Sequence, residues 1–116
     1  MAKLPNFTLC YVPDAKLSDY LLSSEHPDGA AKAKFLKSFG FTRSDPQVLR
    51  IALLAHATNH GVADSRQTDF GVIYEVDGEI NSPDGRNPFV RVVWTIDSGT
   101  DQPRLVTLVP VKDDAR

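Results

Sequence analysis

The sequence predicts an α+β fold in which three N-terminal helices pack on one face of a four-stranded antiparallel sheet. Apolar side chains recur at helical spacings of three and four over residues 14–60, whereas residues 61–110 hold valine-rich segments in which apolar and polar side chains alternate. Turn residues separate these segments. Helices followed by a strand meander are typical of an antiparallel sheet that helices cover on one face.

The length of 116 residues favours a single domain, because two ordinary domains need a longer chain. A composition of 41% hydrophobic and 24% charged residues is typical of a globular protein and argues against disorder or a fibrous repeat. We therefore expect one domain over residues 1–116. Its parts are an N-terminal extended arm (1–13), a helical half (14–60), a sheet half (61–110) and a tail (111–116).

The first predicted helix covers residues 16–22. Asp14 precedes it as a candidate capping residue, and Leu17, Tyr20 and Leu21 share one face at spacings of three and four. This spacing indicates a short helix with one apolar face.

Two further helices are bounded by stop and start signals. The second spans residues 29–39 and ends at Gly40, a residue type that commonly follows a helix. The third begins at Ser44, a candidate cap that stands two residues before Pro46, and ends before Gly61.

Four strands are predicted in the sheet half from alternating side chains and from the turn residues between them. They cover residues 62–67, 71–77, 89–96 and 104–109. Trp94 is the only tryptophan, and we expect it in the core.

Charge and cysteine content argue against several classes of protein. A net charge of −2 and a pI near 5.8 disfavour a tight nucleic-acid binder, although basic residues gather in the helical half. The single cysteine, Cys10, allows no intrachain disulfide and no thiolate zinc site. No apolar run suits a signal peptide or a membrane span, so we expect a cytoplasmic protein without a membrane partner, or a domain cut from a larger chain.

Lys32 stands out because it falls within the apolar arc that Ala31, Phe35, Leu36 and Phe39 form on the second helix. A lysine in that position must extend its ammonium to water or lose solvation. One interpretation is that its alkyl stem covers a neighbouring phenylalanine. The other is a functional site, since His26 lies just before the same helix and brings an imidazole to its N-terminus.

Two further patterns carry polar groups toward the interior. His56 and His60 are four residues apart on the third helix, a spacing that suits either one metal ion or hydrogen-bonded core histidines, but Ala57 stands where a metalloprotease needs glutamate. On the last strand, Arg104 and Thr107 fall on opposite faces, so one of them points toward the interior or its rim.

These residues carry a resemblance to an uncharacterised family of small bacterial domains. Members occur alone beside small partner genes and at the C-termini of phage head-morphogenesis and polymorphic toxin proteins. The match spans about residues 14 to 110. It rests on KLSDYLL at 16–22, on His26-Pro27 with Gly29, Lys32, Ala33 and Phe35, on Gly40-Phe41, and on PRLVT at 103–107.

The layout is also similar to the superfamily of metal-independent RNases that includes barnase, the EndoU domains and the RelE-type toxins. There a helix-borne histidine or lysine and a strand-borne arginine, serine or threonine flank the scissile phosphate. The resemblance implies a site made of His26, Lys32, Arg104 and Thr107. Leu108 stands where an aromatic residue commonly follows the threonine motif, so a stacking role there is not expected.

This resemblance implies a toxin-type endoribonuclease that cleaves RNA with a histidine, lysine and arginine site. It implies no cofactor and no metal, and a cognate antitoxin or immunity protein as partner. RNA carries its own nucleophile in the 2′-hydroxyl, so such an enzyme needs proton transfer and cations around the phosphate. The alternative is a non-enzymatic interaction module that docks a partner through a sheet edge or a basic helical face.

Overall fold

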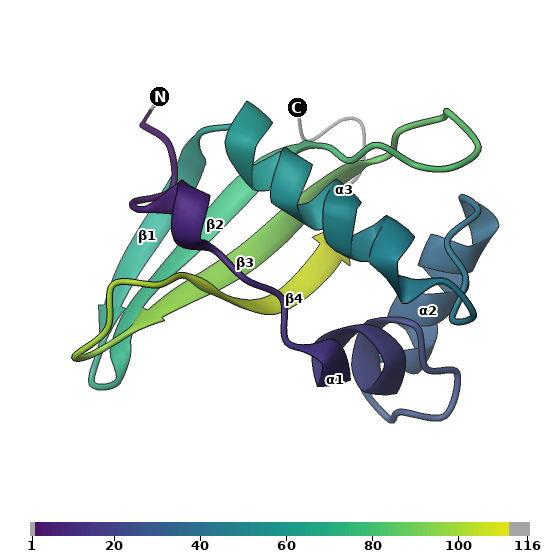
Figure 1. Ribbon diagram of the computed structural model, residues 1–116, viewed down its shortest axis with the longest axis horizontal. Helices are drawn as coiled ribbons and strands as arrows, with labels where there is room; N and C mark the ends of the chain where they lie inside the picture. The colour runs from purple at the N-terminus through teal and green to yellow at the C-terminus, as the bar shows by residue number, and fades with distance from the viewer. Residues whose placement is uncertain (1, 112–116) are drawn as a thin grey trace.

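Four antiparallel strands form one sheet in the order β1-β2-β3-β4 (Figure 1). The computed structural model describes residues 2–111, so the expected tail lies outside the described residues except for Val111. Each strand runs one or two residues beyond its predicted C-terminal end. The strands are β1 (Val62–Thr68), β2 (Gly71–Glu79), β3 (Phe89–Asp97) and β4 (Arg104–Pro110).

Three helical segments precede the sheet and confirm the α+β fold that the sequence predicts. The first is a single α-helical turn that continues directly into a π turn. A 3-10 turn, η1 (Phe7–Leu9), lies in the N-terminal arm. The segments are α1 (Asp14–Lys16) with the π turn η2 (Leu17–Leu21), α2 (Ala30–Ser38) and α3 (Pro46–Asn59).

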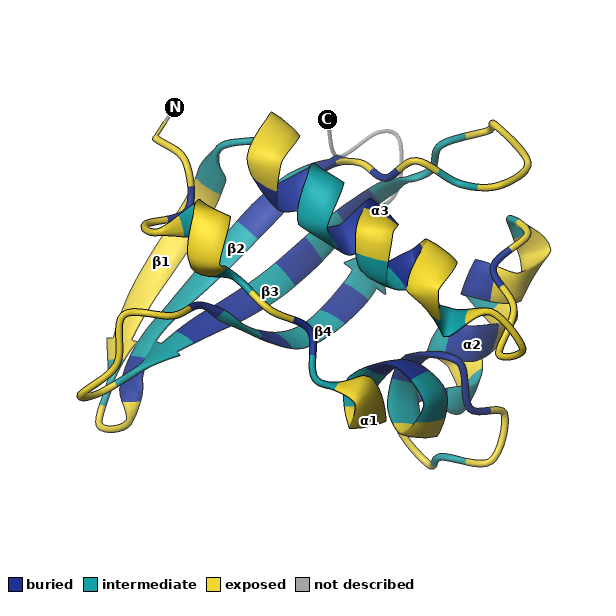
Figure 2. Ribbon diagram, viewed as in Figure 1, coloured by how far each residue is buried: buried dark blue, intermediate teal, exposed yellow. Residues whose placement is uncertain are grey.

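Helix α3 lies across one face of the sheet, and α1 and α2 lie toward the β4 side (Figure 1). Buried segments alternate with less buried ones along β3, which marks its core-facing side chains (Figure 2). Trp94 is fully buried in β3, as predicted. The core combines residues of α3 with residues of the sheet: Leu49, Leu53, Ala57, Val76, Val90, Val92, Trp94, Leu105 and Leu108.

Strand β4 contains an irregularity that changes which of its residues share a face. Thr107 pairs with Val93, whereas Leu105 pairs with the next residue, Trp94, so Val106 is an extra residue in the ladder. Leu105 and Leu108 are therefore both buried. Thr107 lies opposite Val93 on the face that points away from α3.

This bulge corrects the predicted alternation of β4. Strict alternation places Arg104 and Thr107 on opposite faces, but Arg104 pairs with Thr95 and Thr107 with Val93, which lie on the same face of β3. Neither polar side chain has to enter the core.

The predicted helix caps are wrong at two positions. Asp14 is the first residue of α1 and makes no capping bond, and its carboxylate pairs with Arg50 of α3 instead. The third helix begins at Pro46, and Asp45 at its N-cap makes no side-chain capping bond. Ser44 instead shares a hydrogen bond of 3.1 Å with the hydroxyl of Thr42.

The predicted end of the second helix is confirmed. Gly40 has a φ of +101°, a backbone conformation that glycine adopts without a steric cost. The backbone N–H of Phe41 then donates to the carbonyl of Leu36, and the Phe41 side chain is buried.

The N-terminal arm is not extended throughout. Asn6 has a positive φ of 54° and leads into the η1 turn. Tyr11 then forms a parallel bridge to Arg104, with its N–H donating to the carbonyl of Pro103. The arm thereby covers part of the β4 edge.

Candidate active site

Three polar side chains from different elements meet at the β4 edge. The Lys32 ammonium of α2 donates hydrogen bonds of 2.6 Å to the hydroxyls of Tyr20 and Thr107. The two hydroxyl oxygens are 2.8 Å apart and share a further hydrogen bond. We call this arrangement of Lys32, Tyr20 and Thr107 the Lys32 triangle.

The π turn η2 explains how Tyr20 reaches this position. The N–H of Leu22 donates to the carbonyl of Leu17, five residues back, over 2.8 Å. Leu17 and Leu21 are buried, whereas Tyr20 is half-buried. The wider turn thus separates the tyrosine from the leucines that hold the segment on the core.

The buried face of helix α2 matches the predicted arc only in part, because Leu36 is buried and Phe35 packs against the core, as predicted. Ala33 and Leu36 are its buried residues, and Ala31 is exposed. Lys32 is half-buried beside this face, with Nζ 5.0 Å from the centre of the Tyr20 ring. Two hydroxyl acceptors offset the solvation that the ammonium loses at this position.

The Lys32 triangle retains donors for an anion. An ammonium has three N–H donors, and Lys32 uses two of them on the hydroxyls. The bond between Tyr20 and Thr107 uses one of the two hydroxyl hydrogens, which leaves one N–H and one O–H. Within residues 2–111, the only other hydrogen bond of the Thr107 hydroxyl, to the carbonyl of Leu108, is long at 3.5 Å.

The electrostatic surroundings favour the charged form of Tyr20. Burial raises the pKa of the phenol, but hydrogen bonds with Lys32 and Thr107 and the charges of Lys32 and Lys16 outweigh burial. The net pKa of Tyr20 is therefore lowered, which raises the fraction of phenolate at a given pH.

His26 packs against the same tyrosine. Its ring meets the Tyr20 ring edge to face, with 4.9 Å between centroids. Its Nδ1 accepts hydrogen bonds of 3.0 Å from the backbone N–H groups of Asp28 and Gly29. A neutral imidazole in this arrangement carries its proton on Nε2, which is then a donor.

Gly29 allows the turn that holds His26 to approach Tyr20 this closely. A Cβ atom at Gly29 would lie 2.1 Å from the backbone oxygen of Tyr20 and 3.1 Å from its ring. Any side chain at this position would force the turn and η2 apart.

Arg104 has other partners. Its guanidinium makes two bonds of 3.3 Å to the carboxylate of Asp97. The structure therefore brings Lys32 and Thr107 into contact, places His26 against their shared partner Tyr20, and pairs Arg104 with Asp97.

Tyr20 is the residue of this cluster that sequence reasoning missed. It was expected only on the apolar face of the first helix. A signal was present, since Tyr20 lies within KLSDYLL, one of the runs that carry the family resemblance.

The profile of DUF6883, described as a domain of unknown function, matches residues 3–112. The chain belongs to the DUF6883 family. The predicted membership of an uncharacterised domain family is thereby confirmed, and the match assigns no activity to the family. No curated protein matches this DUF6883 domain.

One solved structure with a similar fold comes from a contact-dependent growth inhibition toxin–immunity protein complex of Klebsiella pneumoniae 342. A chain of that complex aligns with a TM-score of 0.69 at 14% sequence identity. The alignment covers 87% of the DUF6883 domain and 99% of the other chain. At this identity the likeness shows a shared fold.

His56 of α3 and His60, which follows the helix, lie elsewhere in the DUF6883 domain. His56 is 2% exposed, with Nε2 3.1 Å from the carbonyl of Gly78, and its ring centre is 4.7 Å from that of His60. Burial and the nearby His60 lower the pKa of His56 to about 4. Residues 2–111 contain no group of three or more His, Cys, Asp or Glu side chains that suits a metal ion.

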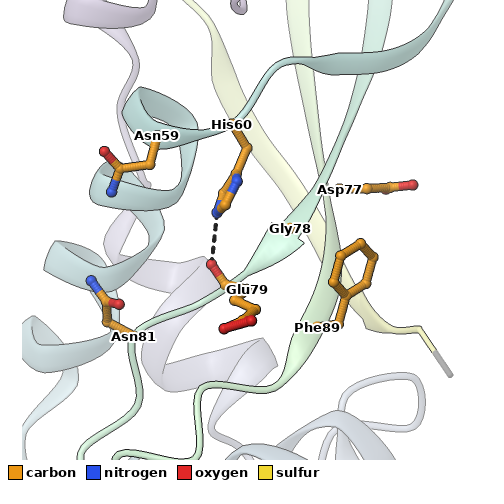
Figure 3. A pocket seen from close by; sticks show the side chains of 7 residues that line it. All are labelled: Asn59, His60, Asp77, Gly78, Glu79, Asn81 and Phe89. Atoms are coloured by element: carbon orange, nitrogen blue, oxygen red, sulfur yellow. Dashed lines mark hydrogen bonds between the residues drawn. The ribbon is translucent and has the colours of Figure 1, made fainter. Parts of the chain in front are cut away.

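His60 also lines a shallow pocket of about 490 Å³ between the end of α3 and strands β2 and β3 (Figure 3). Its Nε2 lies 2.8 Å from the carbonyl of Glu79. Asn59, Asp77 and Asn81 contribute further polar groups.

None of the helices within residues 2–111 combines the length and apolar content that a membrane crossing needs.

Proposed function

We propose that this domain is a toxin-type, metal-independent endoribonuclease whose site consists of Lys32, Tyr20, Thr107 and His26. The observation that carries the proposal is the ammonium of Lys32, which bonds two hydroxyls and, among the described residues, no carboxylate. A half-buried cation with unused N–H and O–H donors is suited to a phosphate group.

The reaction follows from the chemistry of RNA. The 2′-hydroxyl oxygen attacks phosphorus and the bond from phosphorus to the 5′-oxygen breaks, which leaves a 2′,3′-cyclic phosphate and a 5′-hydroxyl. Lys32 donates to the non-bridging oxygens and stabilises the negative charge of the transition state, and the O–H of Thr107 joins it as Tyr20 takes up the 2′ proton. No metal is needed in this step because the substrate contains the nucleophile.

Tyr20 is suited to move the proton. In its phenolate form, which the lowered pKa favours, it accepts the 2′ proton and returns that proton to the departing 5′-oxygen. His26 holds its Nδ1 on backbone N–H groups and donates from Nε2, so we assign it a hydrogen bond to the phosphate. Arg104 is left out of the site because it pairs with Asp97.

The test is product analysis with the purified chain in the presence of a chelator. We expect cleavage of RNA, products that end in 2′,3′-cyclic phosphate and 5′-hydroxyl, and no cleavage of the same sequence with 2′-deoxyribose. Products with 5′-phosphate, or cleavage that depends on added metal, would contradict the mechanism.

A cognate immunity protein is the partner that this function calls for. The structural likeness to a chain of a toxin–immunity complex supports such a partner. We expect it to occlude the Lys32 triangle, and addition of a neighbouring gene product that binds the domain should stop RNA cleavage.

A second candidate is a non-enzymatic interaction module. Strand β1 lies at the edge of the sheet, and within residues 2–111 it pairs with β2 alone. Residues 63–67 of this strand are exposed, and an open edge can accept a strand from another protein. This candidate predicts a stable complex through β1 and no RNA cleavage under any metal condition.

A further inference from the structure

A second lysine lies close to the proposed site. Lys16 ends α1, and its ammonium is 5.1 Å from the centre of the Tyr20 ring. The Lys32 ammonium is 5.0 Å from the same centre, so the two nitrogens are within about 10 Å of each other. Two cations from different elements thus flank one aromatic ring.

Neither cation is neutralised within the described part of the chain. Nearby arginines each pair with a carboxylate: Arg43 with Asp19 and Arg50 with Asp14. Lys16 and Lys32 form no ion pair within residues 2–111. Two unpaired ammonium groups at this distance repel each other, and anions that bind between or beside them relieve that repulsion.

We infer that Lys16 binds the phosphate next to the scissile phosphate, so that the substrate is an RNA strand with at least two consecutive phosphates. The inference rests on the proposed function, which places the scissile phosphate at Lys32. A polynucleotide carries one negative charge per nucleotide, so the neighbouring phosphate of a bound strand meets a second cation. A dinucleoside monophosphate, with a single phosphate, engages Lys32 alone.

The experiment compares substrates that differ by one phosphate. The reference substrate is a dinucleoside monophosphate. It is compared with the same dinucleotide that carries one added phosphate at its 5′ end, and separately with the one that carries it at its 3′ end. The variant is Lys16→Met, which keeps an apolar stem against Tyr20 and removes the charge. Lys34→Met is the matched control, because Lys34 is an exposed lysine of α2.

We expect the wild type and the control to cleave one of the added-phosphate substrates with a kcat/KM about tenfold above that of the dinucleoside monophosphate. Lys16→Met should lose this preference, mainly through KM. Its cleavage of the dinucleoside monophosphate should also fall, because the Lys16 charge contributes to the lowered pKa of Tyr20, so the ratio between substrates is the readout. Lys16→Arg should restore the preference. If Lys16→Met keeps the preference, or lowers cleavage of all substrates equally, the inference is overturned.

Failure of the proposed function gives a different result. If the wild type cleaves no substrate, binding of a 2′-O-methyl oligonucleotide, which has no free 2′-hydroxyl, decides the question. Weaker binding by Lys16→Met than by Lys34→Met supports the phosphate contact, and equal binding overturns it.

Discussion

The hydroxyl of Tyr20 connects the two polar groups that the sequence placed in the site. It bonds Lys32 and Thr107, which come from α2 and β4 and are 75 residues apart in the chain. Its ring also packs against His26. The Tyr20 oxygen and the Lys32 nitrogen therefore both link the helical half of the site to the sheet.

The Tyr20→Phe variant removes this oxygen and keeps the ring. We expect RNA cleavage to fall about 100-fold, because the proton carrier is lost and Lys32 loses one acceptor. The free energy of unfolding should change by only about 1 kcal/mol, the net contribution of a hydrogen bond. Steady-state kinetics and urea unfolding measure the two effects, and an unchanged cleavage rate would exclude Tyr20 from catalysis.

The proximity of Lys32 and Thr107 was predictable, because residue type and resemblance placed both residues in one candidate site. Tyr20 was not, since a tyrosine on an apolar helical face is ordinary packing and only the π turn separates it from the leucines beside it. The resemblance placed Arg104 in the site because this residue lies in PRLVT. In the structure its guanidinium bonds the carboxylate of Asp97 on β3 instead.

Substitution of Arg104 tests whether this residue belongs to the site. Arg104→Ala breaks a half-exposed ion pair with Asp97, and such pairs contribute about 0 to 1 kcal/mol. We expect RNA cleavage to fall less than about tenfold, well short of the effect at a group that stabilises the transition state. A loss as large as that of Tyr20→Phe would restore Arg104 to the site.

At the scale of elements, the site depends on a close contact between the turn before α2 and the turn η2. Gly29 makes this contact possible, because a Cβ there would lie 2.1 Å from the Tyr20 carbonyl oxygen. This close contact between the two turns determines how His26 and Tyr20 lie relative to each other.

The Gly29→Ala variant should separate these two turns. We expect it to lower the free energy of unfolding by about 1 to 3 kcal/mol, the range for overpacking, and to abolish measurable RNA cleavage. Gly85→Ala is the control, because a Cβ there meets open space and only its φ of +80° adds strain. The control should lose some stability and keep its activity. A fully active Gly29→Ala variant would show that the contact is dispensable.

The elements themselves were largely predictable, since side-chain periodicity, together with turn residues and helix start and stop signals, located α2, α3 and all four strands to within a few residues. The η2 turn and the β4 bulge were not, because each inserts one residue into a regular ladder. Whether a residue is inserted depends on how the whole segment packs. In β4, for example, Leu105 and Leu108 both reach the core only because of the bulge. These two irregular segments contribute Tyr20 and Thr107 to the site.

At the scale of the whole molecule, His56 couples stability to pH. Burial and the adjacent His60 lower its pKa to about 4 in the folded chain, whereas an unfolded histidine has its ordinary value of 6.5. Between these values the unfolded state binds more protons than the folded state. Stability therefore falls as the pH decreases from about 6.5 to about 4.

Urea unfolding at pH 7 and pH 4.5 measures this effect. The shift in the pKa of His56 corresponds to a loss of about 3 kcal/mol over the full window. Glutamine in the His56→Gln variant cannot titrate, so the stability of this variant should change much less between the two pH values. An equal pH dependence in both proteins would show that His56 is not responsible.

The site occupies a small part of a chain whose net charge is −2, so the molecule as a whole does not attract RNA. In the proposed function, recognition of RNA must therefore depend on the two cations beside Tyr20, Lys16 and Lys32. The central claim is therefore that the Lys32 ammonium acts on a phosphate.

The most direct test measures kcat/KM for RNA cleavage by Lys32→Met and by Lys34→Met, with chelator present. Methionine keeps the apolar stem at either position and removes the charge. We predict a loss of about 100-fold or more for Lys32→Met and less than about twofold for Lys34→Met, with both variants folded by circular dichroism. Equal activity of the two variants would contradict the claim that Lys32 is the phosphate-binding group.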